Sequence, residues 1–232
     1  MTPRTVPPVW FRLPPGFHDI CPADRAALEE VAGALEALGG SGEAAGAAAG
    51  AGAGSQLAGL MDCLDALAGQ PGLHLVHTAV GLHPEGPEAV STSLFTLTVR
   101  AADEAGGGAG SGAAVARTAL ALARSASGSG STRRFVDLAS GRPCALVSGV
   151  VPAPGTGRGL FQGRAVTAHP EGRHLFLLDL TSAVAEHAAS YTAVLEAIAH
   201  TIAFSDPRPP GPPGPPGQPG AAGTSRILEL LG

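Results

Sequence analysis

The histidines and carboxylates are the residues of this chain whose types and spacing come nearest to a metal or acid–base site. His74 and His77 lie three residues apart in a segment with the composition of a strand, so they point to opposite faces. His169 and His174 flank one predicted hairpin, where they could be cross-strand neighbours. A small-molecule or metal-binding pocket on the sheet is therefore the alternative hypothesis, with these candidate lining residues: His77, His83, His169, His174, Asp179 and Glu186. No H-E-x-x-H or comparable pattern orders them, so we expect no metal.

Other patterns typical of catalysis are incomplete. Glu196 and His200 are four residues apart on a predicted helix but lie off its apolar stripe, which favours an exposed pair over an acid–base dyad. The glycines of GTGRG at 155–159 precede a strand rather than a helix N-terminus, so they form no phosphate cradle. No G-x-S-x-G elbow occurs. The chain also contains no lysine, which excludes Walker, Schiff-base and kinase lysines.

The cysteines and their neighbours add no site. Cys21, Cys63 and Cys144 are odd in number and far apart, which fits a reduced chain better than a disulfide framework or a zinc site. Asp62 and Asp65 beside Cys63 are typical of a solvated helix face. We therefore expect a protein that is not an enzyme, with no catalytic, cofactor-binding or metal-binding residues.

Composition and charge bound the environment and the partners. The net charge is −5, and Arg133-Arg134 is the one dense basic feature, so we expect no nucleic-acid partner. No run of about 18 apolar residues predicts a membrane-spanning helix, and the first residues lack a signal-like apolar stretch. We therefore expect a cytoplasmic protein. The absence of lysine and asparagine, with abundant Ala, Gly, Pro and Arg, indicates a GC-rich, actinobacterial type of genome.

The elements follow from hydrophobic periodicity and from Gly and Pro breaks. Residues 1–9 read as a flexible N-terminus, and 10–206 as a single α+β domain with a low-complexity insertion at 39–55. The predicted elements, in order, are a short extended segment 10–13, helices 22–38 and 56–69, strands 73–82 and 90–100, helix 113–124, strands 134–139, 143–151, 160–168 and 174–181, and helix 183–204. Six strands come as hairpins, which predicts an antiparallel sheet of about six strands with helices packed on it. The alternation of Phe95, Leu97 and Val99 with Thr96 and Thr98 predicts one buried and one wet face.

The tetrapeptide H-P-E-G occurs at 83–86 and again at 169–172, each time between two predicted strands. One interpretation is a favourable turn, in which Pro presets φ and Gly accepts the exit geometry. The other is a duplicated ββα unit, because a helix follows each hairpin.

The order of elements, with a closing helix that ends at Phe204 and Ser205, resembles the Mog1/PsbP-like α/β/α sandwich. The opening WFRLPPGF at 10–17 is similar to the start of many Streptomyces-type proteins, some of which are linked by gene neighbourhood to type VII-like secretion. The resemblance covers about residues 8–206. It implies a binding or assembly role and carries over no catalytic residue.

The C-terminal segment joins a spacer to an apolar tip. Residues 207–224 are rich in Gly-Pro-Pro and predict a disordered, polyproline II-like linker, too short for a stable collagen helix. The tip 225–232 carries four large aliphatic residues: Ile227, Leu228, Leu230 and Leu231. Such a tip could dock in a partner's groove, fold back on its own domain, or fray. The sequence thus favours an adaptor that binds a protein partner through these four residues within a larger assembly.

Overall fold

The computed structural model describes residues 6–20, 73–84, 90–102, 111–125, 131–152 and 159–207. Several predicted segments lie outside these ranges: the helices 22–38 and 56–69, the insertion 39–55, the linker from residue 208 onward and the tip 225–232. The described elements are β1 (Phe17–Asp19), β2 (Leu73–Pro84), β3 (Val90–Ala101), α3 (Ser111–Ser125), β4 (Thr132–Asp137), β5 (Pro143–Pro152), β6 (Gly159–Ala168), β7 (His174–Ser182), the 3-10 turn η1 (Ala185–His187) and α4 (Ala188–His200).

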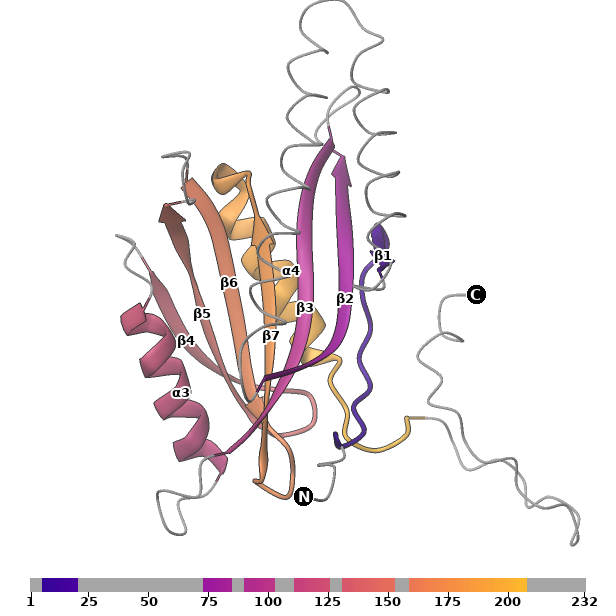
Figure 1. Cartoon of the computed structure of the whole chain (residues 1–232), viewed down its shortest axis with the longest axis vertical. Coiled ribbons are helices and arrows are strands. Elements are labelled where there is room, and N and C mark those ends of the chain that lie inside the picture. The colour runs from indigo at the N-terminus through magenta and orange to yellow at the C-terminus, as the bar shows by residue number, and fades with distance from the viewer. Residues whose placement is uncertain are drawn as a thin grey trace, which may run out of the picture.

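The strands form one seven-stranded antiparallel sheet in the order β1-β2-β3-β7-β6-β5-β4 (Figure 1). The predicted α+β class is confirmed, and the six predicted hairpin strands are β2 to β7 within two residues at each end. The seventh strand, β1, was not predicted. It pairs Phe17 with Gly81 and Asp19 with Ala79 on the outer edge of β2. Three residues are too few to show a recognisable alternation of apolar and polar side chains. The strand is therefore defined by its backbone pairing with β2 and not by its sequence.

One face of the sheet carries α4. Phe95, Leu97 and Val99 of β3 lie on this face and are almost fully buried, as are Phe176, Leu178 and Leu180 of β7. The helix contributes Tyr191, Leu195 and Ile198 to the same core. Gly163 of β6 lets the helix approach, because a Cβ there would lie 3.0 Å from Leu195 Cδ2. The apolar stripe predicted for the last helix is confirmed at these positions.

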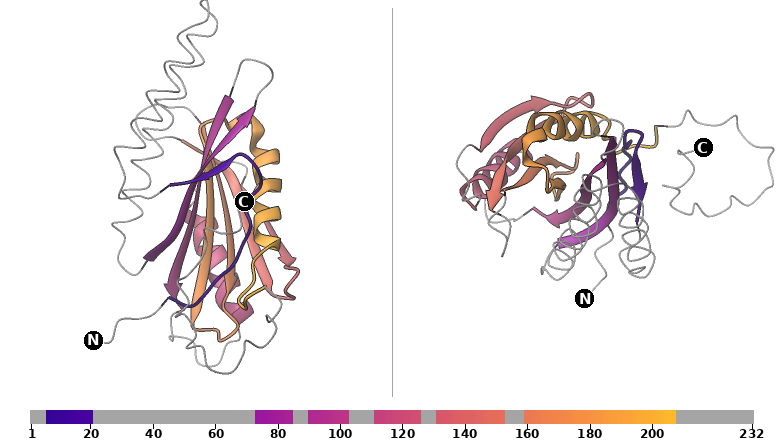
Figure 2. Two further views of the ribbon diagram at one scale, coloured as in Figure 1. Left: turned by 90° about the vertical axis from the view of Figure 1, so that its right-hand side faces the viewer. Right: turned by 90° about the horizontal axis from the view of Figure 1, so that it is seen from above.

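The opposite face carries α3, which packs on β5 and β6. Val115 and Ala119 are buried, as predicted, against Ala145, Val147 and Val166. Figure 2 shows the two helices on opposite sides of the sheet. The predicted wet face of β3 is wrong, because Thr96 and Thr98 are only 1% and 2% exposed. Threonine suits a strand through its branched Cβ and is no reliable sign of solvent exposure.

The two H-P-E-G sequences have different structures. The second is a turn, in which the N–H of Gly172 donates to the carbonyl of His169 at 2.8 Å and Gly172 adopts φ +72°. In the first, His83 and Pro84 are still paired in β2. If the hairpins β2–β3 and β6–β7 were a duplicated pair, the antiparallel pairing of β3 with β7 would relate them by a two-fold axis normal to the sheet. Such duplicated ββα units would place both helices on one face, whereas α3 and α4 lie on opposite faces, so the turn interpretation is favoured.

The last helix is shorter than predicted. The segment 183–204 splits into η1 and α4, and α4 ends at His200. After it, Ala203 and Trp10 exchange two backbone hydrogen bonds of 2.9 Å each. The predicted extended segment 10–13 is therefore tied to the exit of α4 by one bridge and is not a strand of the sheet. Ile202 and Phe204 still pack on the core. The apolar pattern that predicted a helix to residue 204 therefore continues past the end of α4 at His200.

Candidate functional site

His77 lies in a small aromatic environment between β1 and β2. Its Nε2 is 3.1 Å from Oδ1 of Asp19, without the alignment of a hydrogen bond. Its ring meets that of Phe11 edge-on at 5.1 Å and lies 6.3 Å from that of Phe95. Burial lowers the pKa of His77 below its ordinary value, and the carboxylate of Asp19 opposes that shift. This is a neutral, packed histidine rather than an open ligand.

His169 and His174 do lie side by side, as the hairpin predicts. Their ring centroids are 6.4 Å apart, and the N–H of His169 donates to the carbonyl of His174 at 2.9 Å. The His169 ring packs on Phe176 and Phe204, and its Nδ1 accepts a hydrogen bond from the N–H of Glu171 at 3.3 Å. Burial lowers the pKa of His169. Nδ1 of His169 therefore already accepts a hydrogen bond within the turn.

The predicted histidine pocket is not formed. His77 pairs with Leu97 and His174 with Ala101, four residues further along β3, which is about 13 Å at the usual strand rise. Asp179 lies on the opposite face of the sheet, and Glu186 is exposed on η1. Within the described ranges, no three His, Cys, Asp or Glu side chains gather closely enough to hold a metal ion. His169 and His174 share one hairpin and lie together. The position of His77 relative to them depends on sheet order, and it lies far from both.

Asp179 instead forms a buried ion pair. Arg164 Nε donates to Asp179 Oδ1 at 2.5 Å, across β6 and β7. Asp179 is 5% exposed, and burial raises its pKa while the guanidinium opposes that shift. Thr96 and Thr78 continue the same row across β3 and β2, and their buried hydroxyl groups have no hydrogen-bond partner in the described part of the chain. This polar row through the sheet interior is invisible in the sequence, because its members come from four strands.

A serine–histidine pair lies at the other end of the α4 face. Nε2 of His83 and Oγ of Ser93 are 2.7 Å apart, and Ser91 Oγ is hydrogen-bonded to the hydroxyl of Tyr191 at 2.9 Å. A histidine beside a hydroxyl is the pairing that activates a nucleophile. Ser93 is 0% exposed, however, so a substrate carbonyl has no access to it. We interpret the pair as a structural one. Both residues belong to one predicted hairpin, but their contact depends on its register, which no local motif specified.

Two of the remaining titratable candidates, Glu196 and Cys144, lie among the described residues. Glu196 pairs with Arg134 of β4 rather than forming the predicted pair with His200. Cys144 is a free thiol at 0% exposure, and burial raises its pKa to about 12. Cys21 and Cys63 lie outside the described residues. The predicted GTGRG loop does too, except for Gly159, which begins β6.

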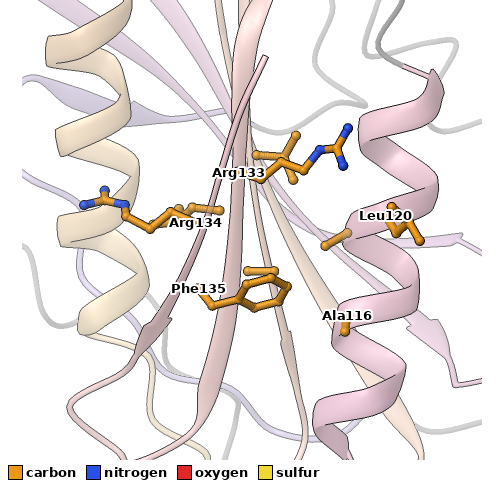
Figure 3. Close-up of a pocket in the computed structure, with 9 residues that line it drawn as sticks. Ala116, Leu120, Arg133, Arg134 and Phe135 are labelled. Carbon is orange, nitrogen blue, oxygen red and sulfur yellow. The ribbon is translucent and has the colours of Figure 1, made fainter.

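The outer side of the sheet at β4 presents a different kind of surface. Five of the six residues of β4 are exposed, and Phe135 is 62% exposed. Arg133 and Phe135 point towards α3, whereas Arg134 points towards α4 (Figure 3). Between α3 and β4 lies a hollow of about 230 Å³, lined by Ala116, Ala119, Leu120, Phe135, Ala145 and Val147, among others. Leu120 is 40% exposed at its rim. We call β4 with this hollow the α3–β4 surface.

Comparisons with known proteins place few limits on function. No protein-family model matches the chain, and no curated protein matches it. Among solved structures, it is similar to PA94 from Pseudomonas aeruginosa, described as a protein of unknown function and suggested regulator. The TM-score is 0.37 at 17% identity, over 60% of this chain and 99% of PA94. In the part of the chain that the structure describes, no helix has the length and apolar character to cross a membrane.

Proposed function

We propose that this protein is a non-enzymatic, cytoplasmic adaptor that binds protein partners within a larger assembly. The observation that carries the proposal is the α3–β4 surface, where an aromatic side chain that is 62% exposed stands on the last strand of the sheet that the described residues form. Large exposed apolar groups rimmed by charge are typical of contact surfaces. An assembly role of this kind agrees with the resemblance to the Mog1/PsbP-like sandwich. It also agrees with the similarity of residues 10–17 to the start of Streptomyces-type proteins, some of which are linked to secretion.

The polar groups inside the domain support contact rather than chemistry. Asp179 and Ser93 are almost fully buried, and their side chains are paired with those of Arg164 and His83. The Cys144 thiol is buried with a raised pKa, which opposes formation of the reactive thiolate. The reactive side-chain types of the core therefore serve packing and hydrogen bonding.

An adaptor needs a second point of attachment, and the C-terminal tip offers one. Its four aliphatic residues, Ile227, Leu228, Leu230 and Leu231, have the spacing of a short amphipathic segment that binds in a groove. The linker before it, residues 207–224, is 18 residues long, which spans roughly 50 Å as polyproline II. A tether of this length raises the local concentration of the tip near a partner that the domain already contacts.

Affinity capture from an actinobacterial lysate tests the tip. Three baits are compared: the full chain, a chain that ends at Pro207, and the full chain with Ile227, Leu228, Leu230 and Leu231 all changed to Ser. A full chain with Ala221→Ser and Ala222→Ser in the linker is the matched control. We expect the control to retain partners that both tip variants lose, and a fluorescent peptide of residues 221–232 to bind the purified partner directly.

Capture of the same proteins by all four baits would contradict the role of the tip. A fifth bait with Phe135→Asp tests the α3–β4 surface separately. The adaptor proposal fails if neither the tip nor Phe135 changes what is captured.

A further inference from the structure

Three properties of strand β4 indicate which kind of molecule could bind to the α3–β4 surface. It is the last strand of the sheet, so one side of its backbone has no strand neighbour among the described residues. Its side chains are exposed at five of six positions. Its sequence, Thr132-Arg-Arg-Phe-Val-Asp137, places opposite charges on the two sides of a central aromatic residue. An open edge of this kind is a template for pairing with another strand.

We propose that a second copy of this chain occupies the surface, with its β4 paired antiparallel to β4 of the first copy and Phe135 opposite Phe135. The inference rests on the proposed function to the extent that both treat the α3–β4 surface as a binding surface. The symmetry is two-fold about an axis normal to the sheet, which is the closed arrangement that homodimers most often use. Seven strands from each copy would then form one continuous sheet.

Charge complementarity selects this register. With Phe135 at the centre, Arg133 of each copy lies opposite Asp137 of the other, and Arg134 lies opposite Val136. Opposite charges and aromatic pairs are the cross-strand contacts that stabilise an antiparallel ladder. Arg133, Phe135 and Asp137 alternate with Arg134 and Val136, so the aromatic pair and both ion pairs lie on the face that carries α3.

Other registers lose these contacts. Centring on Arg134 puts two Arg134 guanidinium groups face to face, and like charges directly opposite each other destabilise a ladder. Centring on Val136 places Phe135 opposite Asp137. The register centred on Phe135 also leaves Arg134 free to keep its ion pair with Glu196 of its own chain. Arg133 and Asp137, in contrast, have no ion pair within the described residues.

The size of the contact sets the expected strength. Six residues of one edge strand, with Phe135 and the rim at Leu120, form an interface smaller than the standard of about 1,600 Å². We therefore expect a dimer with a Kd of about 10 μM. A monomer would instead mean that Arg133 and Arg134 guard the edge against pairing, which is a common use of charge on edge strands.

Sedimentation velocity of the full chain from about 1 to 100 μM tests the dimer. The charge pairs allow a reciprocal design. Arg133→Asp alone and Asp137→Arg alone each place like charges opposite each other, so we expect each variant to dimerise at least about tenfold more weakly. An equimolar mixture of the two variants restores two opposite-charge pairs, so it should form a heterodimer. The double variant should recover the homodimer for the same reason.

Arg173→Asp is the matched control, since it makes the same charge change at an exposed residue in the turn between β6 and β7. We expect it to dimerise like the original chain. Circular dichroism and thermal unfolding establish that each variant is folded. The proposal is overturned if the original chain stays monomeric at 100 μM, or if the mixture forms no heterodimer. Partner capture that still depends on the tip would then show that the adaptor role stands although the dimer does not.

Discussion

Arg164 and Asp179 form an ion pair across the middle of the sheet, with Nε and Oδ1 2.5 Å apart and the Asp179 side chain 7% exposed. Their neighbours in the same row are Thr96 on one side and Val147 on the other. Taking both charges out of water is costly, and their attraction offsets that cost only while both are present. Burial raises the pKa of Asp179 in spite of the adjacent guanidinium, which means that desolvation is the larger effect.

We predict that removing one member of this pair destabilises the domain strongly. Arg164→Met should lower the free energy of unfolding by about 3 kcal/mol, because it leaves the buried Asp179 carboxyl without its partner. Asp179→Leu should cost less, because the Arg164 side chain that it leaves unpaired is 23% exposed. The double variant should lie within about 1 kcal/mol of the original chain, since apolar side chains of similar size replace both charges. Urea denaturation of the four proteins measures the coupling. Additive losses would show that the two residues act independently.

Gly81 should be one of the least replaceable glycines. A Cβ at this position would lie 2.6 Å from Ser93 Oγ, 2.8 Å from His83 Nε2 and 2.9 Å from Phe17 Cε1. Gly81→Ala therefore displaces the hydrogen-bonded pair and should cost about 1–3 kcal/mol. Gly112→Ala on α3 is the control, because its new methyl group meets nothing closer than 3.9 Å. That variant should be unchanged or more stable by about 0.5 kcal/mol. Equal thermal midpoints for the two variants would refute the steric argument.

Cys144 should be protected from thiol reagents while the domain is folded. It is 0% exposed, and burial, together with the nearby charge of Glu196, raises its pKa to about 12. At pH 8 we expect iodoacetamide to modify Cys144 at least about a hundredfold more slowly in the native chain than in guanidinium chloride. Peptide mapping by mass spectrometry separates Cys144 from the other two cysteines. Similar rates in the two conditions would mean that this part of the core opens readily.

His77 should make the domain less stable in mild acid. Its pKa is lowered in the folded state, so the unfolded chain binds the proton more tightly. Its contribution to stability is complete above the ordinary value of 6.5 and is lost as the pH falls through the lowered value. His77→Gln should therefore lose less stability than the original chain between pH 7.5 and 5. Parallel denaturation curves at several pH values test this, and an identical pH dependence in both proteins would contradict it.

The sequence by itself determined the hairpins β2–β3, β4–β5 and β6–β7, and the buried faces of α3 and α4. These features depend on side-chain periodicity and turn chemistry within about 25 residues of sequence. Gly172 is an example, because its turn needs the positive φ that the structure shows there. It also placed His169 beside His174, because one hairpin fixes both. It failed for β1, whose three residues are defined by their pairing with β2.

The tertiary structure alone decided which strands are neighbours and which face each helix covers. Sheet order placed Thr96 of β3 beside Asp179 of β7 and separated His77 from His174. Packing of the sheet also buried Thr96, where alternation suggested solvent. It also left β4 on the outside, which turned an ordinary amphipathic strand into an exposed surface centred on Phe135. The physical reason is that side-chain periodicity is a local property, whereas strand order results from burying several such faces together, and a single segment carries no record of its neighbours.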